Sequence, residues 1–462
     1  MNAALRALNS QSEMKTIEMA LGARDMTSYA MRRAIDEWFG AWFRREPTGE
    51  EDPCQRLPYA IVNKLVKATF AEYDSSIMDA GASPKGQYLD AARQGFDAKR
   101  RELLQWAMVG GECLAKPLPE AGRVRWQLIR RDRYIVLGRD ADGQLTDIAT
   151  AEKSAQNNRY YTLIERRTVG ADGLLTLQNR LYEATDRHMV GSRVPLATLP
   201  RYAALAERYT YPTPLGGLGL VQVRLPAANC VDGSGDGVAV YEPALGLIHN
   251  INRNEWQLGR EFELGRARIV ASADVLATQD GRRQLKDDVF VGLEDNPANT
   301  GITTFSPSLR NANYEQRRQA YLKAVENLLG IKRGMLSDAE AVSKTATEIN
   351  SSAGDYSLSI IDYQNLYYDA LQEALQLADQ LGQVYGLCDD STWDKNRLTV
   401  TWGNGVLYDA DAEWRTRLEL VQSGLLKPEL ALAWKFDLPC ETDADLAFIR
   451  QKYMPELAEM EG

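Results

Sequence analysis

The stretch Asn313–Ile349, NYEQRRQAYLKAVENLLGIKRGMLSDAEAVSKTATEI, decides the fold of this 462-residue chain. It begins with a helical pattern, breaks at Lys332–Gly334, and resumes as a helix from about Lys344 to Leu387. No proline stands between Pro307 and Pro428, so about forty residues can form one helix of roughly 60 Å. A helix of that length must cross more than one structural unit, and Gly354 is its expected weak point.

The segment before this stretch predicts a matching outward helix. A helical pattern runs from about Tyr241 to Leu264, with Pro243 suited to its first turn. Its apolar positions indicate a packed stripe: Leu245, Ile248, Ile251 and Phe262. A small β-rich insert then separates it from the helix that begins the deciding stretch. Two helices therefore carry the chain out to a small module and back. Their polar faces are broad, so we expect identical neighbours in a ring to cover the rest.

The N-terminal part reads as helices followed by a sheet. Helices are expected at Thr27–Arg45 with Thr27 as the N-cap, after Pro58 as far as Tyr73 and beyond, and near Tyr88–Val109. From Gly122 to about Tyr202, short alternating stretches are separated by Asp-Gly turns, which is typical of antiparallel hairpins. Residues 211–237 are rich in proline and glycine and are expected to form a loop.

The C-terminal part predicts one strand and three helices. RLTVTW, residues 397–402, has the alternation of a strand. The helices are expected at Ala410–Ser423, Pro428–Phe436 and Asp443–Tyr453, with Asp409 and Thr442 as caps of the first and third. The fold class predicted for the whole chain is therefore α+β and mostly helical.

Charge limits how this protein could handle nucleic acid. The chain has 54 basic and 64 acidic residues, a net charge of −10. Proteins that grip DNA by releasing counterions usually carry a basic excess. The acidity argues against tight wrapping of DNA over the whole surface, and it allows local basic patches or a channel in which DNA slides.

Cysteine and histidine usage argues against a metal site or a disulfide framework. The five cysteines are far apart and form no CxxC pair, and the only histidines are His188 and His249. The N-terminus has no unbroken apolar core, so no signal peptide is expected. No window approaches the roughly 18 apolar residues of a membrane helix. We expect a soluble protein, made in a cytoplasm and without a membrane partner.

Motifs for enzymatic chemistry are missing from the sequence. There is no GxxxxGK[ST], GxSxG or HExxH. The glycine-rich segments 216–219 and 233–237 lack the strand and helix context of a dinucleotide site. The carboxylate pairs Asp287-Asp288 and Asp389-Asp390 lie in turn-like stretches, where exposed acidity is ordinary. We expect no catalytic residue, no cofactor and no metal.

Several segments keep a recognisable order along the chain. The strongest is KTATEI, residues 344–349, which follows a glycine-interrupted loop. The others are GDGVAVY 235–241, GRARI 265–269, TFSPSLR 304–310, LLGIKRGMLS 328–337, TVTW 399–402 and DADAEW 409–414. On these segments the sequence resembles the portal proteins of tailed bacteriophages, of the type found in long-tailed phages with non-contractile tails. The resemblance covers about Gly235 to Glu413, and before Gly122 it rests on helix pattern and position alone.

A plainer interpretation of KTATEI stays open. Thr345 and Glu348 have the spacing of a capping box, which would make this segment simply a good helix start. That interpretation does not account for the insert and helices that flank it.

The resemblance implies a division of the chain into the parts of a portal subunit. They are an N-terminal wing (1–237), first stem helix (238–266), clip (267–311), second stem helix (312–331), tunnel loop (332–345), long wing helix (346–387), wing strand (388–408) and C-terminal crown (409–462). The long helix would cross the wing.

The resemblance also implies a function and partners. Portal subunits form a ring, usually of twelve copies, at one capsid vertex of the virion. The ring is the channel through which double-stranded DNA is packaged and ejected. It would dock the terminase large subunit and then a head-completion adaptor protein, and it would contact the major capsid and scaffolding proteins. The family has no catalytic site.

Residues near these parts, most of them basic, are the candidates for contact with DNA or with docking partners. Around the tunnel loop the candidates are Lys332, Arg333, Met335, Ser343 and Lys344. Candidates facing the channel from the stem are Arg253, Arg260 and Arg266, and candidates for docking at the clip are Arg282, Arg283 and Lys286. Each basic residue has an ordinary alternative as part of a solvated face, an ion pair between subunits or a charged hairpin turn.

A second function stays open beside the portal. The chain could be another structural component of a virion, a different connector or a scaffold-like protein without a DNA channel. Long helices and an acidic surface suit both. A closed ring with an axial hole wide enough for DNA separates the two.

Overall fold

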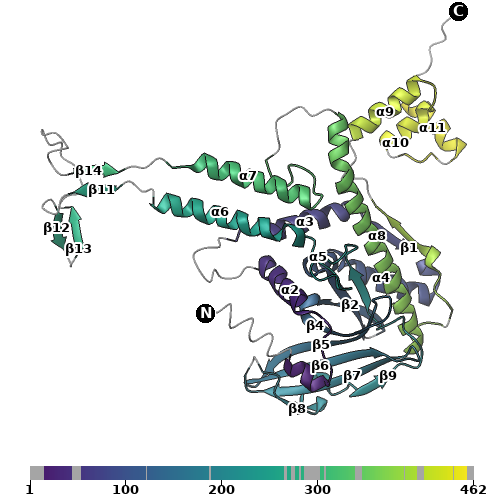
Figure 1. Ribbon diagram of the computed structural model, residues 1–462. Coiled ribbons are helices and arrows are strands. Elements are labelled where there is room, and N and C mark those ends of the chain that lie inside the picture. The colour runs from purple at the N-terminus through teal and green to yellow at the C-terminus, as the bar shows by residue number, and fades with distance from the viewer. Residues whose placement is uncertain are drawn as a thin grey trace, which may run out of the picture. The chain divides into compact units, whose positions relative to one another are not determined.

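The computed structural model describes most of the chain. The described residues are 15–43, 54–120, 122–186, 189–264, 268–271, 276–279, 282–285, 302–305, 309–338, 346–389, 391–402, 410–436, 438–440 and 442–454. They form two compact units, Met1–Thr401 and Trp402–Gly462. Helices and antiparallel sheets make up the first unit (Figure 1), so the α+β class predicted from the sequence is confirmed.

Helix α2 (Tyr29–Trp42) opens the N-terminal part, and its cap differs from the one expected. Ser28, not Thr27, is the N-cap, and its hydroxyl accepts from the Met31 N–H at 3.1 Å. The Thr27 hydroxyl instead accepts from the Arg131 guanidinium at 2.8 Å. Of the apolar residues at helical spacing in this segment, Met31, Ile35, Trp38 and Phe39 are buried, whereas Phe43 at the C-cap is 39% exposed.

The next two predicted helices are shorter than expected. Helix α3 (Leu57–Thr69) ends at Thr69, whose hydroxyl donates to the Leu65 carbonyl. Strand β1 (Asp74–Ile77) follows. The third predicted helix is two, α4 (Pro84–Asp97) and α5 (Arg100–Gly110). Both errors have one cause: partners distant in sequence compete with the helical pattern. Strand β1 pairs with β15 (Leu398–Thr401), more than three hundred residues away.

The predicted hairpin region forms the largest sheet, which is antiparallel. Its order is β4-β5-β6-β7-β8, and β9 also pairs with β7. The strands are β4 Tyr134–Arg139, β5 Leu145–Gln156, β6 Arg159–Val169, β7 Leu175–Ala184, β8 Ser192–Val194 and β9 Arg208–Thr210. The two Asp-Gly turns close the hairpins β4-β5 and β6-β7, which confirms the prediction for these positions.

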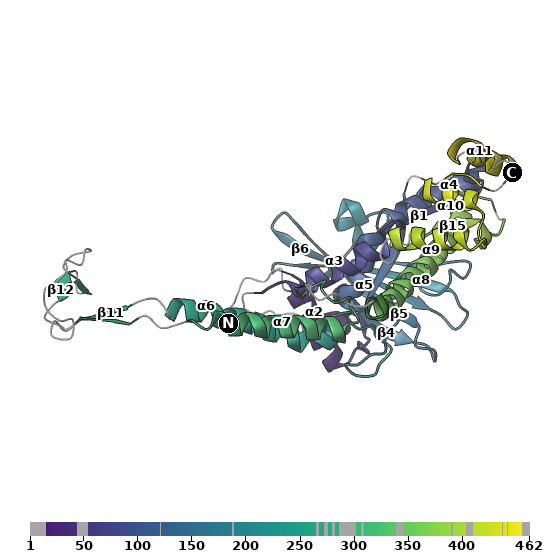
Figure 2. The ribbon, with the colours of Figure 1, turned by 90° about the horizontal axis from the view of Figure 1, so that it is seen from above.

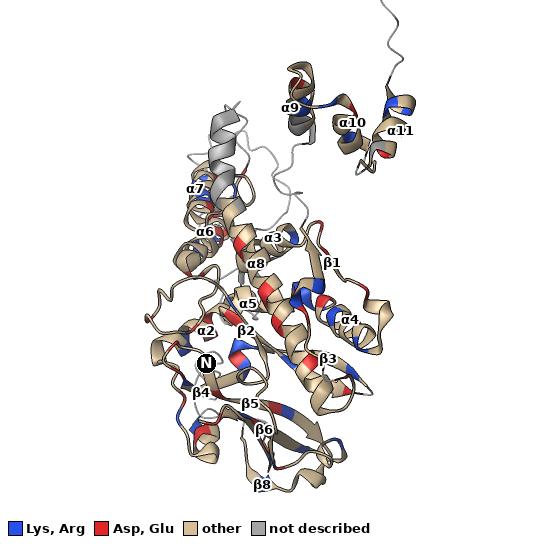
Figure 3. Cartoon of the chain, turned by 90° about the vertical axis from the view of Figure 1, so that its right-hand side faces the viewer, with Lys and Arg blue, Asp and Glu red and all other residues tan. Residues whose placement is uncertain are grey.

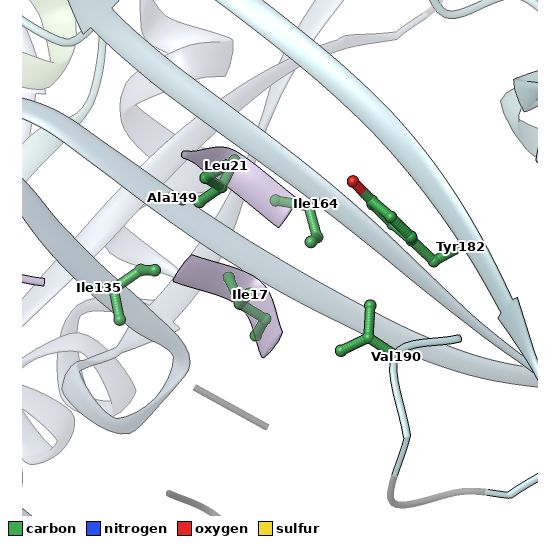
Figure 4. Close-up of a cluster of buried hydrophobic side chains, with 7 residues drawn as sticks. All are labelled: Ile17, Leu21, Ile135, Ala149, Ile164, Tyr182 and Val190. Atoms are coloured by element: carbon green, nitrogen blue, oxygen red, sulfur yellow. The ribbon is translucent and has the colours of Figure 1, made fainter. Parts of the chain in front are cut away.

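Both faces of this sheet carry apolar side chains. One face packs against a helical segment at residues 15–21 through Ile17 and Leu21 (Figure 4). That segment contacts Ile135, Ala149, Ile164 and Tyr182 from four successive strands, together with Val190. The other face presents Tyr161, Leu163 and Leu181 to the short 3-10 turns Leu196–Thr198 and Pro200–Tyr202. Alternation along β6 and β7 thus buries both sides of the sheet.

A second, three-stranded sheet has the order β10-β2-β3. Strands β2 (Glu112–Glu120) and β3 (Arg123–Arg130) form a hairpin, and β10 (Val221–Arg224) pairs with β2. The loop expected over 211–237 therefore contains a strand. Val221 and Val223 are buried there, and two alternating positions were too few to stand out from the surrounding glycine and proline.

The outward and returning helices are present. Helix α6 (Leu245–Leu264) follows a 3-10 turn, Glu242–Ala244, that contains Pro243, and α7 (Asn311–Leu328) lies beside it in both views (Figures 1 and 2). In the chain between them, β11 (Arg268–Ala271) pairs with β14 (Ile302–Phe305), and β12 (Leu276–Gln279) pairs with β13 (Arg282–Leu285). The expected β-rich insert is confirmed for these strands.

Helix α8 (Ala346–Val384) is one helix of 39 residues and continues through Gly354. Its middle is fastened by Asp97 at the end of α4. The Asp97 carboxylate accepts from the hydroxyls of Tyr73 and Tyr367, each at 2.7 Å, and pairs with Arg93 at 2.9 Å. Near its C-terminal end, buried Asp379 pairs with buried Lys85 at 2.6 Å. Two buried carboxylates thus hold α8 against α4.

The second unit contains α9 (Ala410–Gln422), α10 (Pro428–Phe436) and α11 (Asp443–Tyr453). All three were predicted with bounds within one residue of these. Thr442 caps α11 in a capping box with Asp445, which confirms it as the N-cap. The expected cap Asp409 lies outside the described residues.

We predict that Asp97→Asn destabilises the first unit by about 2–3 kcal/mol, because the buried carboxylate that accepts from the Tyr73 and Tyr367 hydroxyls loses its charge, while Arg93 keeps its ion pair with Asp90. Urea denaturation followed by tryptophan fluorescence measures this change. Asp362→Asn, at an exposed position of α8, is the control and should leave the midpoint of unfolding unchanged. Equal midpoints for the two variants would contradict the anchoring role of Asp97.

Candidate functional site

The base of the α6–α7 pair is well packed. Leu245, Ile248 and Ile251 of α6 are buried, as are Leu322 and Val325 of α7. Higher up, the buried amide of Asn254 donates to the Tyr314 carbonyl at 3.1 Å. The two helices are therefore fixed side by side at this end, where they join the rest of the first unit.

The opposite ends of α6 and α7 meet through one charged contact. Glu261 accepts from the Arg310 backbone N–H at 2.8 Å and from its guanidinium at 3.1 and 3.2 Å. Hydrogen bonds from Arg310 hold the pKa of Glu261 below its ordinary value. Arg310 itself is largely exposed, so this contact orients the helix ends more than it stabilises them.

Apolar side chains on these outer halves face solvent. Phe262 is 46% exposed and Leu264 is 52% exposed, and Leu309 before α7 is 37% exposed. The sequence predicted Phe262 within a packed stripe, and in the single chain that prediction is wrong. The buried residues of α6 end at Asn254, and Phe262 and Leu264 beyond it are exposed.

The loop after α7 is built around one buried carboxylate, Glu326. This side chain accepts the backbone N–H groups of Leu336 at 2.6 Å, Ser337 at 2.9 Å and Gly334 at 3.3 Å. It also accepts the Ser337 hydroxyl at 2.8 Å. Four donors from the loop therefore converge on a fully buried acid. We call this arrangement the Glu326 clasp.

The pKa of Glu326 follows from two opposing effects. Burial alone would raise the pKa of this carboxyl. The hydrogen bonds from Ser337, Leu336 and Gly334 favour the charged form and outweigh burial, so its pKa lies below the ordinary 4.5. The clasp is therefore charged at neutral pH.

Three of the five loop candidates lie in the described loop segment 331–338. Lys332 and Arg333 are exposed on the turn whose later N–H groups bind Glu326. Met335 is half-buried, and its carbonyl accepts from Lys64 of α3. Ser343 and Lys344 lie outside the described residues, as do Thr345 and the expected capping box.

The stem and clip candidates are more scattered. Arg253 and Arg260 are exposed on α6, and Arg260 lies 3.7 Å from Glu263 on the same helix. That contact lies within one helix, and the alternative of an ion pair between subunits stays a prediction. The backbone of Arg282 and Arg283 lies in β13 opposite β12. Arg266 and Lys286 are outside the described residues.

The outer face of α8 is acidic. Figure 3 shows acidic positions along the helix, and Asp362, Asp369 and Glu373 among them are exposed. Their spacing of seven and four residues places them on one helical face. This stripe fits the acidic composition predicted to disfavour tight DNA binding.

Sequence reasoning missed Glu326. Its position between Val325 and Asn327 looks like an ordinary helical acid, and only the folded loop shows that it is buried. The signal available was a glycine-containing break followed by a serine, and this is too common to indicate a carboxylate site.

The described part of the chain has neither a metal-binding cluster nor a membrane-spanning helix. No group of three histidine, cysteine or acidic side chains there is placed to hold a metal ion. No helix among the described residues is long and apolar enough to cross a membrane.

Comparison with known proteins gives distant structural likeness only. No family model and no curated protein matches this sequence. A chain from the "Neck of native GTA particle computed with C12 symmetry" is 13% identical with a TM-score of 0.44, over 92% of this chain and 98% of that one. A chain from the "Neck of empty GTA particle computed with C6 symmetry" is 12% identical with a TM-score of 0.46, over 91% and 97%.

We predict that the loop opens at acidic pH. A depressed pKa makes the stabilisation by Glu326 fully present above its ordinary pKa of 4.5 and lost as the pH falls through the lowered value. Hydrogen exchange of residues 331–338, corrected for intrinsic rates, should stay slow from pH 8 to about pH 5 and rise below about pH 4. Helix α3, which contains no acidic residue, is the control segment. A rise that begins above pH 5 would argue against a charged clasp.

Proposed function

We propose that this chain is the subunit of a portal ring of twelve copies. The ring stands at one capsid vertex of a bacteriophage virion and is the channel for DNA packaging and ejection. It docks the terminase large subunit during packaging and a head-completion adaptor afterwards, and it contacts the major capsid and scaffolding proteins. The supporting observation is the α6–α7 pair, which is packed at its base and leaves apolar side chains exposed along its outer half.

Exposed apolar side chains on a long helix pair favour assembly. Burying a phenylalanine or leucine side chain contributes about 1.5–3 kcal/mol each. In the single chain, Phe262, Leu264 and Leu309 leave much of this contribution unused. A cyclic ring gives every copy the same two neighbours and covers these side chains in all of them.

Charge supports a channel that conducts DNA without holding it. Twelve copies at −10 would carry a net charge of roughly −120, which repels phosphates on average. Lys332 and Arg333 are exposed on a loop with a fixed backbone, and they supply local positive charge. Screened contacts between side chains and phosphates let a duplex slide.

The proposed role is structural, without catalysis, cofactor or metal. The charged clusters of the first unit are placed to hold elements together: Asp97 and Asp379 fasten α8, and Glu326 fastens the loop. The alternative is another structural virion component, a connector or scaffold-like protein without a DNA channel. The exposed stem surface supports assembly in both cases, so the shape of the assembly distinguishes them.

We expect the purified protein to form rings with an axial hole wide enough to pass a DNA duplex. Negative-stain images viewed along the axis and mass photometry measure this, with a main species near twelve times 51.6 kDa. A chain that stays monomeric at high concentration under all salt conditions would rule out the portal. Closed assemblies without a hole would favour the alternative.

We predict that Phe262→Asp lowers the ring fraction at least roughly tenfold, because it places a charge on the apolar surface that a neighbour covers. Met189→Asp is the matched control. Met189 is 62% exposed in a loop of the sheet region, away from the helix pair. Ring fractions that fall equally in both variants would mean that the helix pair is not the assembly surface.

We predict that the double change Lys332→Glu and Arg333→Glu lowers DNase-protected DNA per particle by roughly tenfold, because it reverses the local charge that meets phosphates. Lys67→Glu, at an exposed position of α3, reverses one charge where the double variant reverses two, and it is the control for charge reversal on another element. Quantitative PCR on purified particles gives the readout. Unchanged DNA content in rings of normal shape would place these side chains outside the channel.

A further inference from the structure

We propose that Glu326 is a positioning residue that occupies an anion site made by the loop itself. Within the described residues 331–338, the loop turns the N–H groups of Gly334, Leu336 and Ser337 inward onto this carboxylate and leaves the Lys332 and Arg333 side chains exposed to meet a phosphate. The part of this inference that concerns DNA rests on the proposed channel function. The geometry of the loop and the experiment below require neither DNA nor a ring.

The geometry is that of a filled anion site. The N–H groups of Gly334, Leu336 and Ser337 point to one carboxylate, at 3.3, 2.6 and 2.9 Å, together with the Ser337 hydroxyl at 2.8 Å. Concave groups of successive N–H donors in a turn bind phosphate and other anions. Here the anion is part of the chain, since Glu326 belongs to the helix that the loop leaves.

Second contacts fix the loop on both sides of the clasp. The Asp338 N–H donates to the Gln319 side-chain oxygen at 2.9 Å, and the Ile331 N–H donates to the Glu326 carbonyl at 2.9 Å. Lys64 reaches the Met335 carbonyl from α3. The backbone of residues 331–338 is thereby held at its start, middle and end, and Lys332 and Arg333 lie on its exposed turn.

The chemical consequence concerns how the loop meets a polyanion. An open set of N–H donors would hold a phosphate by short, directional, charge-assisted bonds. Solvated lysine and arginine side chains interact through charge that salt screens within about 8 Å at physiological ionic strength. Because Glu326 fills the site, the backbone N–H groups are not free to bind a phosphate, and the screened contacts of the lysine and arginine side chains remain. A loop of this design touches phosphates without fixing their register.

The experiment measures hydrogen exchange of residues 331–338 in the full chain, with and without inorganic phosphate. In Glu326→Ala we expect exchange at Leu336 and Ser337 to rise roughly tenfold or more, because their acceptor is gone. Added phosphate should restore most of the protection in this variant and leave the wild-type rate unchanged. Restoration by phosphate distinguishes an anion site from a merely structural acid.

Two further variants keep the test decisive. Glu326→Gln fills the same volume with fewer acceptor positions, so we expect faster exchange without rescue by phosphate. Glu263→Ala removes an exposed acid from α6 and should behave as wild type. Circular dichroism of each variant verifies that the helices are intact.

Two results would overturn the proposal. Wild-type exchange rates in Glu326→Gln and in folded Glu326→Ala would show that the carboxylate does not position the loop. Faster exchange in Glu326→Ala that phosphate fails to slow would show that the loop forms no anion site. Either result leaves the portal function standing, because ring formation and packaging are measured separately.

Discussion

Buried carboxylates that meet several donors at once are the interaction on which this structure depends. Asp97 collects two tyrosine hydroxyls and an arginine at the point where α4, β1 and α8 meet. Asp379 pairs with Lys85 farther along the same long helix. A charged group removed from water is tolerated only when such partners satisfy it, so each cluster fixes its elements in one arrangement.

The firmly held part of the molecule contrasts with the half-covered helix pair. Helix α8 lies on α3, α4 and β10 and buries Tyr367, Leu371, Leu375 and Ala378 on that side. Helices α6 and α7 are joined to this body at their base and bury little beyond it. A rigid body with an incompletely covered helix pair suits a subunit whose folding is finished by identical neighbours. The exposed Phe262 belongs to this incompletely covered surface, and in the proposed ring a neighbouring copy covers it.

Charge is organised on the same plan. Acidic positions follow α8 (Figure 3), and Asp362, Asp369 and Glu373 on this helix are exposed. Lys332 and Arg333 are exposed on a loop whose backbone N–H groups are bound by the Glu326 carboxylate. The overall acidity and the local positive charge are therefore separated in the fold. For a channel this separation combines general repulsion of phosphates with weak local guidance.

The sequence by itself determined the elements whose signals are local. Asp-Gly turns located the hairpins, apolar spacing located α2 and α6, and a helical pattern without proline located the long α8. Pro428 and Thr442 marked the starts of α10 and α11. The prediction from the sequence was wrong where a residue or strand distant in the chain determines the local structure. Strand β1 requires β15, and β10 requires β2. The break between α4 and α5 lies where Asp97 meets Tyr367. The clasp also belongs to this second group. Glu326 has the pattern of a surface acid, and only the return of the loop onto α7 makes it a buried acceptor, because burial and hydrogen bonding depend on neighbours in space that helical periodicity does not specify.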